Sequence, residues 1–419
     1  MSVRPALCPA LASALFAAGL ASCSKPVPIL GNVKAVSAGA QHTCVLMADG
    51  AVRCWGSNSH GQVGARGTAE SPLPAQVEEI ADASVVSAGQ LHTCAVLAGG
   101  KVKCWGANAF GQLGNGERPD SAVPVYVKGI EDAVQVTAGW SHTCAVRSGG
   151  GIKCWGLNAS AQLGTSPSES KEKCAGSTGE MPCSRVPVDV EGVEANSVSA
   201  GGDYNCALLK DSTAACWGSN THSQLGITAK KEPDQCDSGG FLHGCSAAPH
   251  AVEKAEAVSA VAAGGYHSCV LGGDSGVKCW GPNHMGQLST GRQKGSAKPV
   301  EAHGLSGVVS ISAGLMHNCA VIRDGTVRCW GSNNAGQLGA TTGRTAHAGA
   351  YSDEKRSTLP FAVKGLANVV SVSCGAEHTC AVFTNGTAAC WGGNQHGKLG
   401  DGTTKNSIAP VFVRAPPQR

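Results

Sequence analysis

Short apolar runs, separated by residues that favour turns, recur along the chain. In the first copy they occupy residues 36–38, 42–47 and 51–55, and an Asp-Gly pair at 49–50 separates the last two. Asp-Gly favours the tight turn of a β-hairpin. In the second copy a fourth run, residues 124–127, begins with proline after a Gly-Gln-Leu-Gly loop. The pattern predicts an antiparallel four-stranded meander without amphipathic helices.

A Cys-Trp-Gly triplet marks each copy of this unit. Its tryptophans lie 50 residues apart between Trp55 and Trp105, and 63 apart between Trp217 and Trp280. The longer spacings contain insertions. A repeat of about 50 residues with several short strands is typical of β-propeller blades. There are seven copies, with the tryptophans Trp55, Trp105, Trp155, Trp217, Trp280, Trp330 and Trp391.

Two cysteines, ten residues apart, flank the hairpin turn of every copy. Residues directly opposite on antiparallel strands lie about 4.5 Å apart at Cα, which a disulfide can bridge. Each bridge would stabilise the fold by about 3 kcal/mol. Two alternatives are buried free thiols and a zinc site built from His42, Cys44 and Cys54, although the fourth copy has Tyr204 at the histidine position. The predicted pairs are Cys44 with Cys54, Cys94 with Cys104, Cys144 with Cys154, Cys206 with Cys216, Cys269 with Cys279, Cys319 with Cys329 and Cys380 with Cys390.

The remaining cysteines fit the same interpretation. Two insertions each hold a local pair that is also predicted to be a disulfide, Cys174 with Cys183 and Cys236 with Cys245. Cys374 replaces an alanine of the Ser-Ala-Gly motif, so we expect an inert buried thiol there. This density of cysteines is typical of an exported protein.

The N-terminus resembles the signal of a bacterial lipoprotein. An apolar stretch, residues 11–21, is too short to span a bilayer and leads to Leu-Ala-Ser before Cys23. We expect residues 1–22 to be removed, Cys23 to be lipidated and residues 23–31 to form a tether. By analogy with bacterial lipoproteins, Ser24 rather than Asp after the lipidated cysteine favours the outer membrane of a Gram-negative cell. The alternative is an ordinary signal peptide followed by a chance cysteine.

The repeats resemble the regulator of chromosome condensation repeat family, whose unit reads Gly-x-x-His-Thr, Asp-Gly and Trp-Gly-x-Asn-x-x-Gly-Gln-Leu-Gly. The Trp-Gly-x-Asn core is present in all seven copies. The resemblance implies an all-β, seven-bladed β-propeller of four-stranded antiparallel blades over residues 32–415. It also suggests that residues 33–36 pair with 410–413 to close the ring. The expected repeats are 33–80, 81–130, 131–192, 193–255, 256–305, 306–366 and 367–415.

Charge and motifs exclude several functions. The net charge is only +3, from 32 basic and 29 acidic residues that are scattered along the chain, so we expect no nucleic-acid partner. No P-loop, Gly-x-Ser-x-Gly or His-Glu-x-x-His motif occurs. We therefore expect a monomer that is not an enzyme and has no cofactor, no catalytic residues and no metal site.

Two sets of loops are candidates for recognition. One is the residue pair between the glycine and histidine of Gly-x-x-His, which should lie on one face. The other is the set of insertions 165–185, 228–248 and 341–358. Both sets could also be structural, as packing residues or as neutral surface variation. The candidate binding face comprises the large side chains Leu91, Trp140, Tyr266, Leu315 and Met316.

The favoured function is a membrane-tethered scaffold that binds a protein or a cell-surface ligand, with inhibition of an enzyme as one form of it. The alternatives are a guanine-nucleotide exchange regulator, by family analogy, and an enzyme acting on envelope glycans. The histidines, asparagines and tryptophans that recur in every copy are interpreted as structural. We expect His42 to hydrogen-bond within its blade, Asn58 to cap the turn after Trp-Gly and Trp55 to pack between blades.

Overall fold

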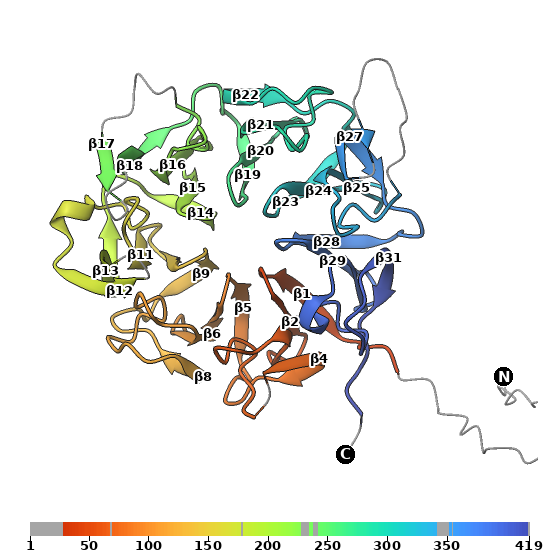
Figure 1. The fold of residues 1–419 in the computed structure, drawn as a ribbon, viewed down its shortest axis with the longest axis horizontal. Helices are drawn as coiled ribbons and strands as arrows, with labels where there is room; N and C mark the ends of the chain where they lie inside the picture. The colour runs from red at the N-terminus through yellow and green to blue at the C-terminus, as the bar shows by residue number, and fades with distance from the viewer. Residues whose placement is uncertain are drawn as a thin grey trace, which may run out of the picture.

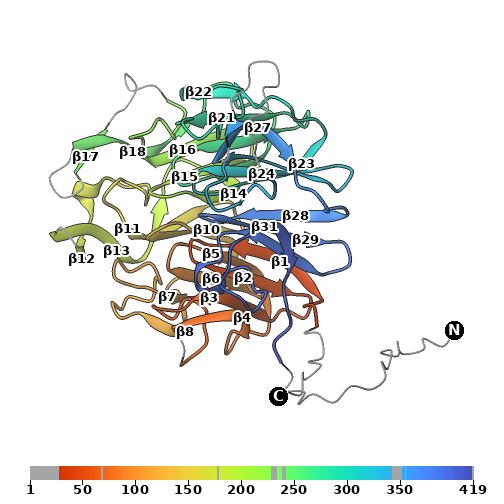
Figure 2. The same cartoon turned by 45° about the vertical axis from the view of Figure 1, so that its right-hand side comes forward.

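The computed structural model describes residues 28–417 except 68, 177–178, 228–233, 238–241, 342–351 and 354. The predicted signal peptide, Cys23 and most of the tether lie outside the described residues. Seven antiparallel sheets surround a central axis as the blades of a β-propeller (Figures 1 and 2). The predicted fold is therefore confirmed. In the described chain, no helix is long and apolar enough to cross a membrane.

Each blade is built in chain order from the axis outward. The innermost strands are β1 (Val33–Ala38), β5 (Ala83–Ala88), β9 (Ala133–Ala138), β14 (Ala195–Ala200), β19 (Val258–Ala263), β23 (Val308–Ala313) and β28 (Val369–Cys374). The second strands are β2 (His42–Met47), β6 (His92–Leu97), β10 (His142–Arg147), β15 (Tyr204–Leu209), β20 (Ser268–Gly272), β24 (His317–Ile322) and β29 (His378–Phe383). The third strands are β3 (Val52–Ser57), β7 (Val102–Gly106), β11 (Ile152–Leu157), β16 (Ala214–Ser219), β21 (Val277–Gly281), β25 (Val327–Ser332) and β30 (Ala388–Gly392).

The outer strands complete the meander. They are β4 (Glu70–Gln76), β8 (Ser121–Tyr126), β13 (Gly179–Val190), β18 (Leu242–Ala251), β22 (Ser296–Glu301), β27 (Arg356–Ala362) and β31 (Ser407–Phe412). The three blades with insertions each carry a fifth strand that four-stranded repeats do not predict: β12 (Glu172–Gly176), β17 (Asp234–Asp237) and β26 (Ser352–Asp353). Two short 3-10 turns are η1 (Pro167–Glu169) and η3 (Gln395–Gly397).

The ring closes differently from the sequence prediction. Strands β1 and β31 belong to separate sheets, so the expected pairing of residues 33–36 with 410–413 is wrong. Instead, Ile29 and Arg414 form an isolated bridge outside the named strands, and the Leu30 amide donates to the Val413 carbonyl at 2.9 Å. Every repeat contains its own inner and outer strands, so no blade needs to borrow a strand from another.

The hairpin cysteines lie directly opposite each other on the second and third strands. Cys44 faces Cys54 in the register, at a Cα–Cα distance of 4.1 Å. The same pairing recurs in every blade, so the alternative of buried free thiols is wrong for these positions. The seven hairpin disulfides join Cys44 with Cys54, Cys94 with Cys104, Cys144 with Cys154, Cys206 with Cys216, Cys269 with Cys279, Cys319 with Cys329 and Cys380 with Cys390.

The other cysteines also lie where the sequence places them. The two insertions hold the predicted disulfides of Cys174 with Cys183 and of Cys236 with Cys245. Cys374 is free and buried. Burial raises the pKa of its thiol to about 12, which keeps the thiol protonated.

The hydrophobic core consists of similar clusters between neighbouring blades. In one of them, Trp105 of the second blade packs with Cys44 and Cys54 of the first. Its indole N–H donates to the Gln62 carbonyl of the first blade at 2.9 Å. All seven repeat tryptophans are fully buried. The repeat tryptophans therefore join each blade to the preceding one, as predicted from the sequence.

The repeat histidines join the blades in a second way. His42 Nε2 lies 2.8 Å from the Thr93 hydroxyl of the next blade, so the prediction of a bond within the blade is wrong. The Thr93 hydroxyl donates to the Gln62 carbonyl and must therefore accept from His42 Nε2–H. In the fourth blade Tyr204 donates to the His267 carbonyl instead. The equivalent contacts are His92–Thr143, His142–Asn205, His267–Asn318, His317–Thr379 and His378–Thr43, the last of which spans the closure.

This bonding leaves the Nδ1 atom of each repeat histidine buried and without a partner. Glycine precedes the loop because a Cβ on Gly39 would lie 2.5 Å from the Gly89 carbonyl oxygen of the next blade and 3.1 Å from His42 Nδ1. Burial lowers the pKa to about 3 for His42, His92 and His317, to about 4 for His142 and His267, and well below 6.5 for His378. All six histidines are neutral at physiological pH.

Asparagine holds the loop after the third strand. Asn58 Oδ1 accepts from the Val63 amide at 2.9 Å, and its side-chain amide donates to the Ala65 carbonyl at 2.8 Å. The corresponding amide contact recurs at Leu113, Leu163, Leu225, Leu288, Leu338 and Leu399. Asn58 and its counterparts therefore cap this turn, as predicted.

Candidate binding face

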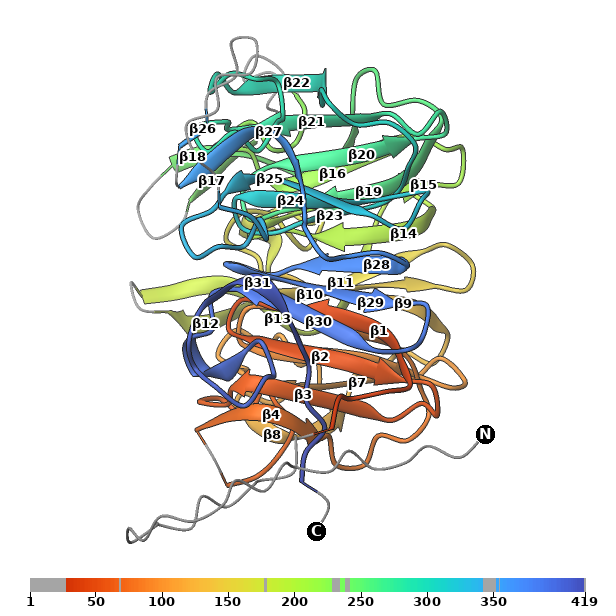
Figure 3. The ribbon, with the colours of Figure 1, turned by 90° about the vertical axis from the view of Figure 1, so that its right-hand side faces the viewer.

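The Gly-x-x-His loops and the described parts of the insertions lie on one face of the propeller. The Gly-x-x-His loops follow the innermost strands, and the insertions follow the third strands, which end beside them. The Ser57 amide donates to the Gln41 carbonyl at 2.9 Å, and the Ser219 amide donates to the Asp203 carbonyl at the same distance. We call this side the loop face, and the side of the Asp-Gly hairpin turns the turn face. Figure 3 shows β12, β17 and β26 gathered toward the loop face.

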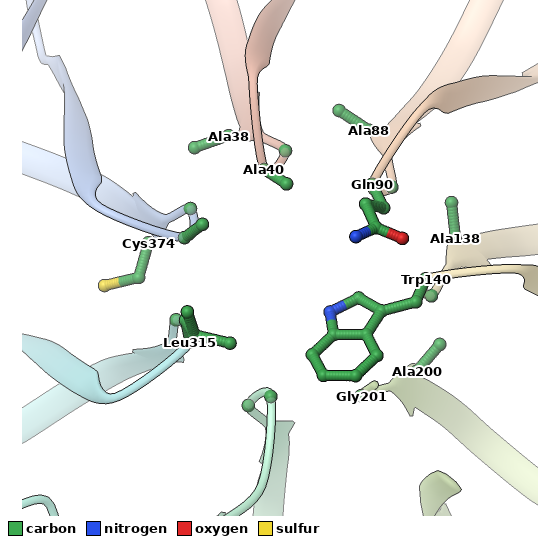
Figure 4. Close-up of a pocket in the computed structure, with 18 of the residues that line it drawn as sticks. Ala38, Ala40, Ala88, Gln90, Ala138, Trp140, Ala200, Gly201, Leu315 and Cys374 are labelled. Carbon is green, nitrogen blue, oxygen red and sulfur yellow. The ribbon is translucent and has the colours of Figure 1, made fainter. Parts of the chain in front are cut away.

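The first residue of each Gly-x-x-His pair faces the axis. In six blades it lines a cavity of about 100 Å³, together with the Ala-Gly or Cys-Gly ends of the seven innermost strands. Figure 4 shows the Trp140 indole projecting over this opening, with Gln90 on one side and Leu315 across it. Trp140 and Leu315, both predicted, therefore lie at the mouth of the axial cavity.

The second residue of the pair lies outside that cavity. Leu91, Tyr266 and Met316 occupy this position and are partly buried. Tyr266 contacts another member of the predicted face: its ring centroid is 5.2 Å from that of Trp140, at an interplanar angle of 84°. The structure therefore brings Trp140 and Tyr266 together.

Gly202 makes the contact between Trp140 and Tyr266 possible. Trp140 belongs to the third blade and Tyr266 to the fifth, and the glycine lies between them in the fourth. A Cβ on Gly202 would lie 2.7 Å from the Gly265 carbonyl oxygen and 3.2 Å from the indole, and the Trp140 amide donates to the Gly202 carbonyl at 3.3 Å. Tyr266 also packs on His222, with ring centroids 5.0 Å apart. Selecting residues by apolar size alone missed both Gly202 and His222.

Asp203 places a carboxylate beside these rings. It remains partly accessible to solvent, yet it is surrounded by enough protein that burial raises its pKa to about 6. The Gln162 amide donates to its Oδ1 at 3.3 Å. Burial and then the charge of Asp203 raise the pKa of the Tyr266 phenol. Asp203 directly follows Gly202, which lies against the Trp140 indole, so Trp140, Tyr266 and Asp203 form one patch on the loop face.

Two disulfide-stapled hairpins lie on the same loop face (Figure 3). Strands β12 and β13 carry the bond of Cys174 with Cys183, and β17 and β18 carry that of Cys236 with Cys245. Each hairpin rests on the preceding blade: the Gly116 amide donates to the Arg185 carbonyl at 2.9 Å, and Ser160 Oγ lies 3.0 Å from His243 Nε2. Such stapled loops lose little entropy on binding. Most of the third insertion lies outside the described residues.

Metal binding has no support from the cysteines. Within the part of the chain that the structure describes, one group of suitable side chains lies close enough together to hold an ion: His317, Cys319 and Cys374. Cys319 is bonded to Cys329, so its sulfur is not available as a thiolate ligand. The same reasoning removes the zinc alternative for His42, Cys44 and Cys54, because those two cysteines are also bonded to each other.

Comparison with known families agrees with this arrangement. The Regulator of chromosome condensation (RCC1) repeat matches residues 33–62, 84–112, 133–162, 196–224, 258–287, 308–337 and 369–398. A second description of the same repeat matches 49–96, 99–146, 216–271 and 324–382. The chain belongs to the RCC1 repeat family. Its seven matched segments coincide with the inner three strands of the seven blades.

Curated relatives share the RCC1 repeats over part of their length. The probable E3 ubiquitin-protein ligase HERC6 of Homo sapiens is 31% identical over 241 residues, which are 56% of this chain and 22% of HERC6. The human HERC3 is 29% identical over 217 residues, 51% of this chain and 19% of HERC3. This RCC1-repeat chain therefore spans about a fifth of the length of the relatives that it matches.

Solved structures show the same fold. Prp20p of Saccharomyces cerevisiae, which has binding properties to Gsp1p and histones, superposes with a TM-score of 0.71 at 20% identity, over 92% of this chain and 87% of Prp20p. Human WBSCR16 superposes with a TM-score of 0.68 at 23% identity, over 85% of this chain and 89% of WBSCR16. At this level of identity, the likeness of these propellers to the RCC1-repeat chain concerns the fold alone.

Proposed function

We propose that this RCC1-repeat propeller is a non-enzymatic binding protein that recognises a protein or cell-surface ligand with its loop face. The observation that carries the proposal is the contact of Trp140 with Tyr266 beside two stapled hairpins on that face. Rigid, partly exposed aromatic side chains are the residues that dominate binding hot spots. Binding by Prp20p to Gsp1p and histones supports the use of this scaffold for protein partners.

A binding role fits Asp203 better than hydrolysis does. Glycoside hydrolysis requires two carboxyl groups about 5–10 Å apart across the scissile bond. No pair of acidic residues recurs at matched positions of the seven repeats. An exchange-factor role would require a cytosolic GTPase, which an exported chain does not meet.

The second part of the proposal is export and attachment to the outer membrane through a lipid on Cys23. Nine disulfides support an oxidising compartment. The chain enters the first blade on the turn face, where the Val33 amide donates to the Gly386 carbonyl of a hairpin turn at 2.8 Å. A lipid anchor attached at that end would leave the loop face pointing away from the membrane.

Replacing the lipidated residue tests the anchor. We expect Cys23→Ser to move the protein from the membrane fraction to the soluble periplasmic fraction, because a chain that has lost its signal peptide and lacks Cys23 carries no acyl group. Fractionation followed by immunoblotting measures the distribution, with Cys374→Ser as the matched cysteine control. Retention in the membrane fraction of Cys23→Ser protein whose signal peptide has been cleaved would show that no lipid at this residue is needed.

Removing the aromatic pair tests the binding face. We expect Trp140→Ala combined with Tyr266→Ala to weaken partner binding by about 30-fold or more, since truncated hot-spot residues cost about 2 kcal/mol or more. The measurement is quantitative recovery of partners from envelope extract on immobilised protein, followed by affinity measurement with each recovered partner. Val134→Ser, at a 52% exposed residue of β9, is the control at the other end of that strand. Equal recovery of every partner by the double variant would remove the loop-face proposal.

A further inference from the structure

The patch formed by Trp140, Tyr266 and Asp203 combines aromatic side chains with an acidic group. Trp140 and Tyr266 meet at 84°, and Asp203 directly follows Gly202, which lies against the Trp140 indole. An aromatic face carries a partial negative charge. The aromatic face that the edge-to-face pair leaves open and the carboxylate both attract a cation.

Among the described residues, no lysine or arginine forms an ion pair with the Asp203 carboxylate. The carboxylate accepts from the neutral Gln162 amide. The other neighbouring group that acts on it is His243. A largely buried carboxylate without a counter-charge is costly, and an incoming cation would relieve that cost.

The position of the aromatic residues suits an inserted side chain. Gly202 leaves room for the indole to lie over the fourth blade, whose stapled hairpin carries His243. A cation placed over Trp or Tyr within about 6 Å of the ring centroid is attracted by the ring, and tryptophan is the best such partner. A carboxylate adds charge-assisted hydrogen bonds to a guanidinium or ammonium group.

The geometry points to a binding site, formed by Trp140, Tyr266 and Asp203, for the lysine or arginine side chain of a protein partner. The inference rests on the proposed function, since it names the chemistry that the loop face recognises. An apolar side chain would bury the Asp203 charge without compensation, and an acidic side chain would be repelled by it. The cationic side chain is the occupant that satisfies all three residues.

Trp140 itself provides the readout. The chain has eight tryptophans, and the seven repeat tryptophans are fully buried, whereas Trp140 is partly exposed. In ¹⁵N-labelled protein, Trp140→Phe identifies its indole signal, and the other seven signals serve as internal controls. The probes are Nα-acetyl-arginine amide and Nα-acetyl-lysine amide, with Nα-acetyl-norleucine amide as the neutral control and choline and maltose as the alternatives.

We expect the arginine or lysine amide to shift the Trp140 indole signal in a saturable way, and norleucine amide to leave it in place. Asp203→Asn keeps the shape of the carboxyl group but removes its charge, and it should weaken the binding by about tenfold or more, as should Tyr266→Ala. The matched control is Glu377→Gln, at the same loop position in the seventh blade, which has Ala376 before it instead of an aromatic residue. It should bind as the wild type does.

Three outcomes would overturn the assignment: no shift with either cationic amide, an equal shift with norleucine amide, or a response to choline or maltose alone. Equal binding by the Asp203→Asn protein, with an unchanged melting temperature, would also overturn it. The result is separable from the proposed function. If Trp140→Ala with Tyr266→Ala abolishes partner recovery but neither amide binds, the loop face remains the binding face and only the cationic class is wrong.

Discussion

Lowering the pH from 7 to 5 is expected to reduce the free energy of unfolding by an amount of the order of 10 kcal/mol. The cause is the set of six buried, neutral histidines between the blades, such as His42, whose pKa burial lowers to about 3. Each folded-state pKa lies below the unfolded value of about 6.5. The unfolded chain therefore binds more protons than the folded chain between about pH 3 and 6.5. The contribution of the histidines to stability is complete above this pH range and is lost as the pH falls through it.

The geometry of the ring explains why these histidines resist protonation. Nε2–H of His42 is committed to Thr93, so the added proton must go to Nδ1, which is buried beside Gly39 without an acceptor. Protonation would leave a charged N–H without a partner in the core. Proton binding at Nδ1 therefore requires the interface between blades to open, which couples proton uptake to unfolding of the ring.

Guanidinium unfolding at pH 7, 6 and 5 measures this effect. The loss should approach about 1.4 kcal/mol per pH unit for each buried histidine. His42→Gln should reduce the pH dependence by one such contribution, whatever its effect on stability at pH 7. His303→Gln, which changes an exposed histidine, should leave it unchanged. A free energy of unfolding that is constant to about 1 kcal/mol between pH 7 and 5 would contradict the argument.

Reduction of the disulfides is expected to have an effect at least as large. Each hairpin disulfide closes a loop with a sequence separation of 10 residues, for which the chain-entropy model gives about 3 kcal/mol. The seven hairpin loops do not overlap along the chain, so their contributions should be nearly additive. Their sum exceeds the total stability of about 5–15 kcal/mol that is usual for a folded protein. We therefore expect the reduced chain to be unfolded or close to unfolding at ambient temperature.

Thermal and guanidinium unfolding with and without reductant measure the total contribution of the disulfides to stability. Removing one hairpin disulfide at a time measures the contribution of each. Cys94→Ala with Cys104→Ala should cost about 3 kcal/mol. Cys374→Ala, which removes the free buried thiol, is the matched control and should cost less. A thiol titration of the denatured, unreduced chain beginning at Ser24 should find one free thiol, that of Cys374. Several free thiols, or equal stability after reduction, would refute the prediction.

The sequence predicted well what depends on neighbouring residues. The strands, the hairpin turns and the register that places Cys44 opposite Cys54 all lie within about ten residues of one another. Seven repetitions of the same unit then made the propeller the expected fold, because one unit cannot bury its apolar faces alone. The candidate site was predicted only in part: large side chains in the Gly-x-x-His loops led to Trp140 and Tyr266, but gave no reason to choose Gly202 or Asp203.

The sequence by itself therefore determined the seven units, their strands and the pairing of their cysteines, since hydrophobic period and turn chemistry act locally. The tertiary structure decided the rest: that His42 bonds to the next blade, that the ring closes without exchanging a strand, and that Trp140 crosses the fourth blade to reach Tyr266. These contacts join separate repeats, and their geometry follows from how the blades are tilted and spaced around the axis. A repeated local pattern carries no information about that spacing.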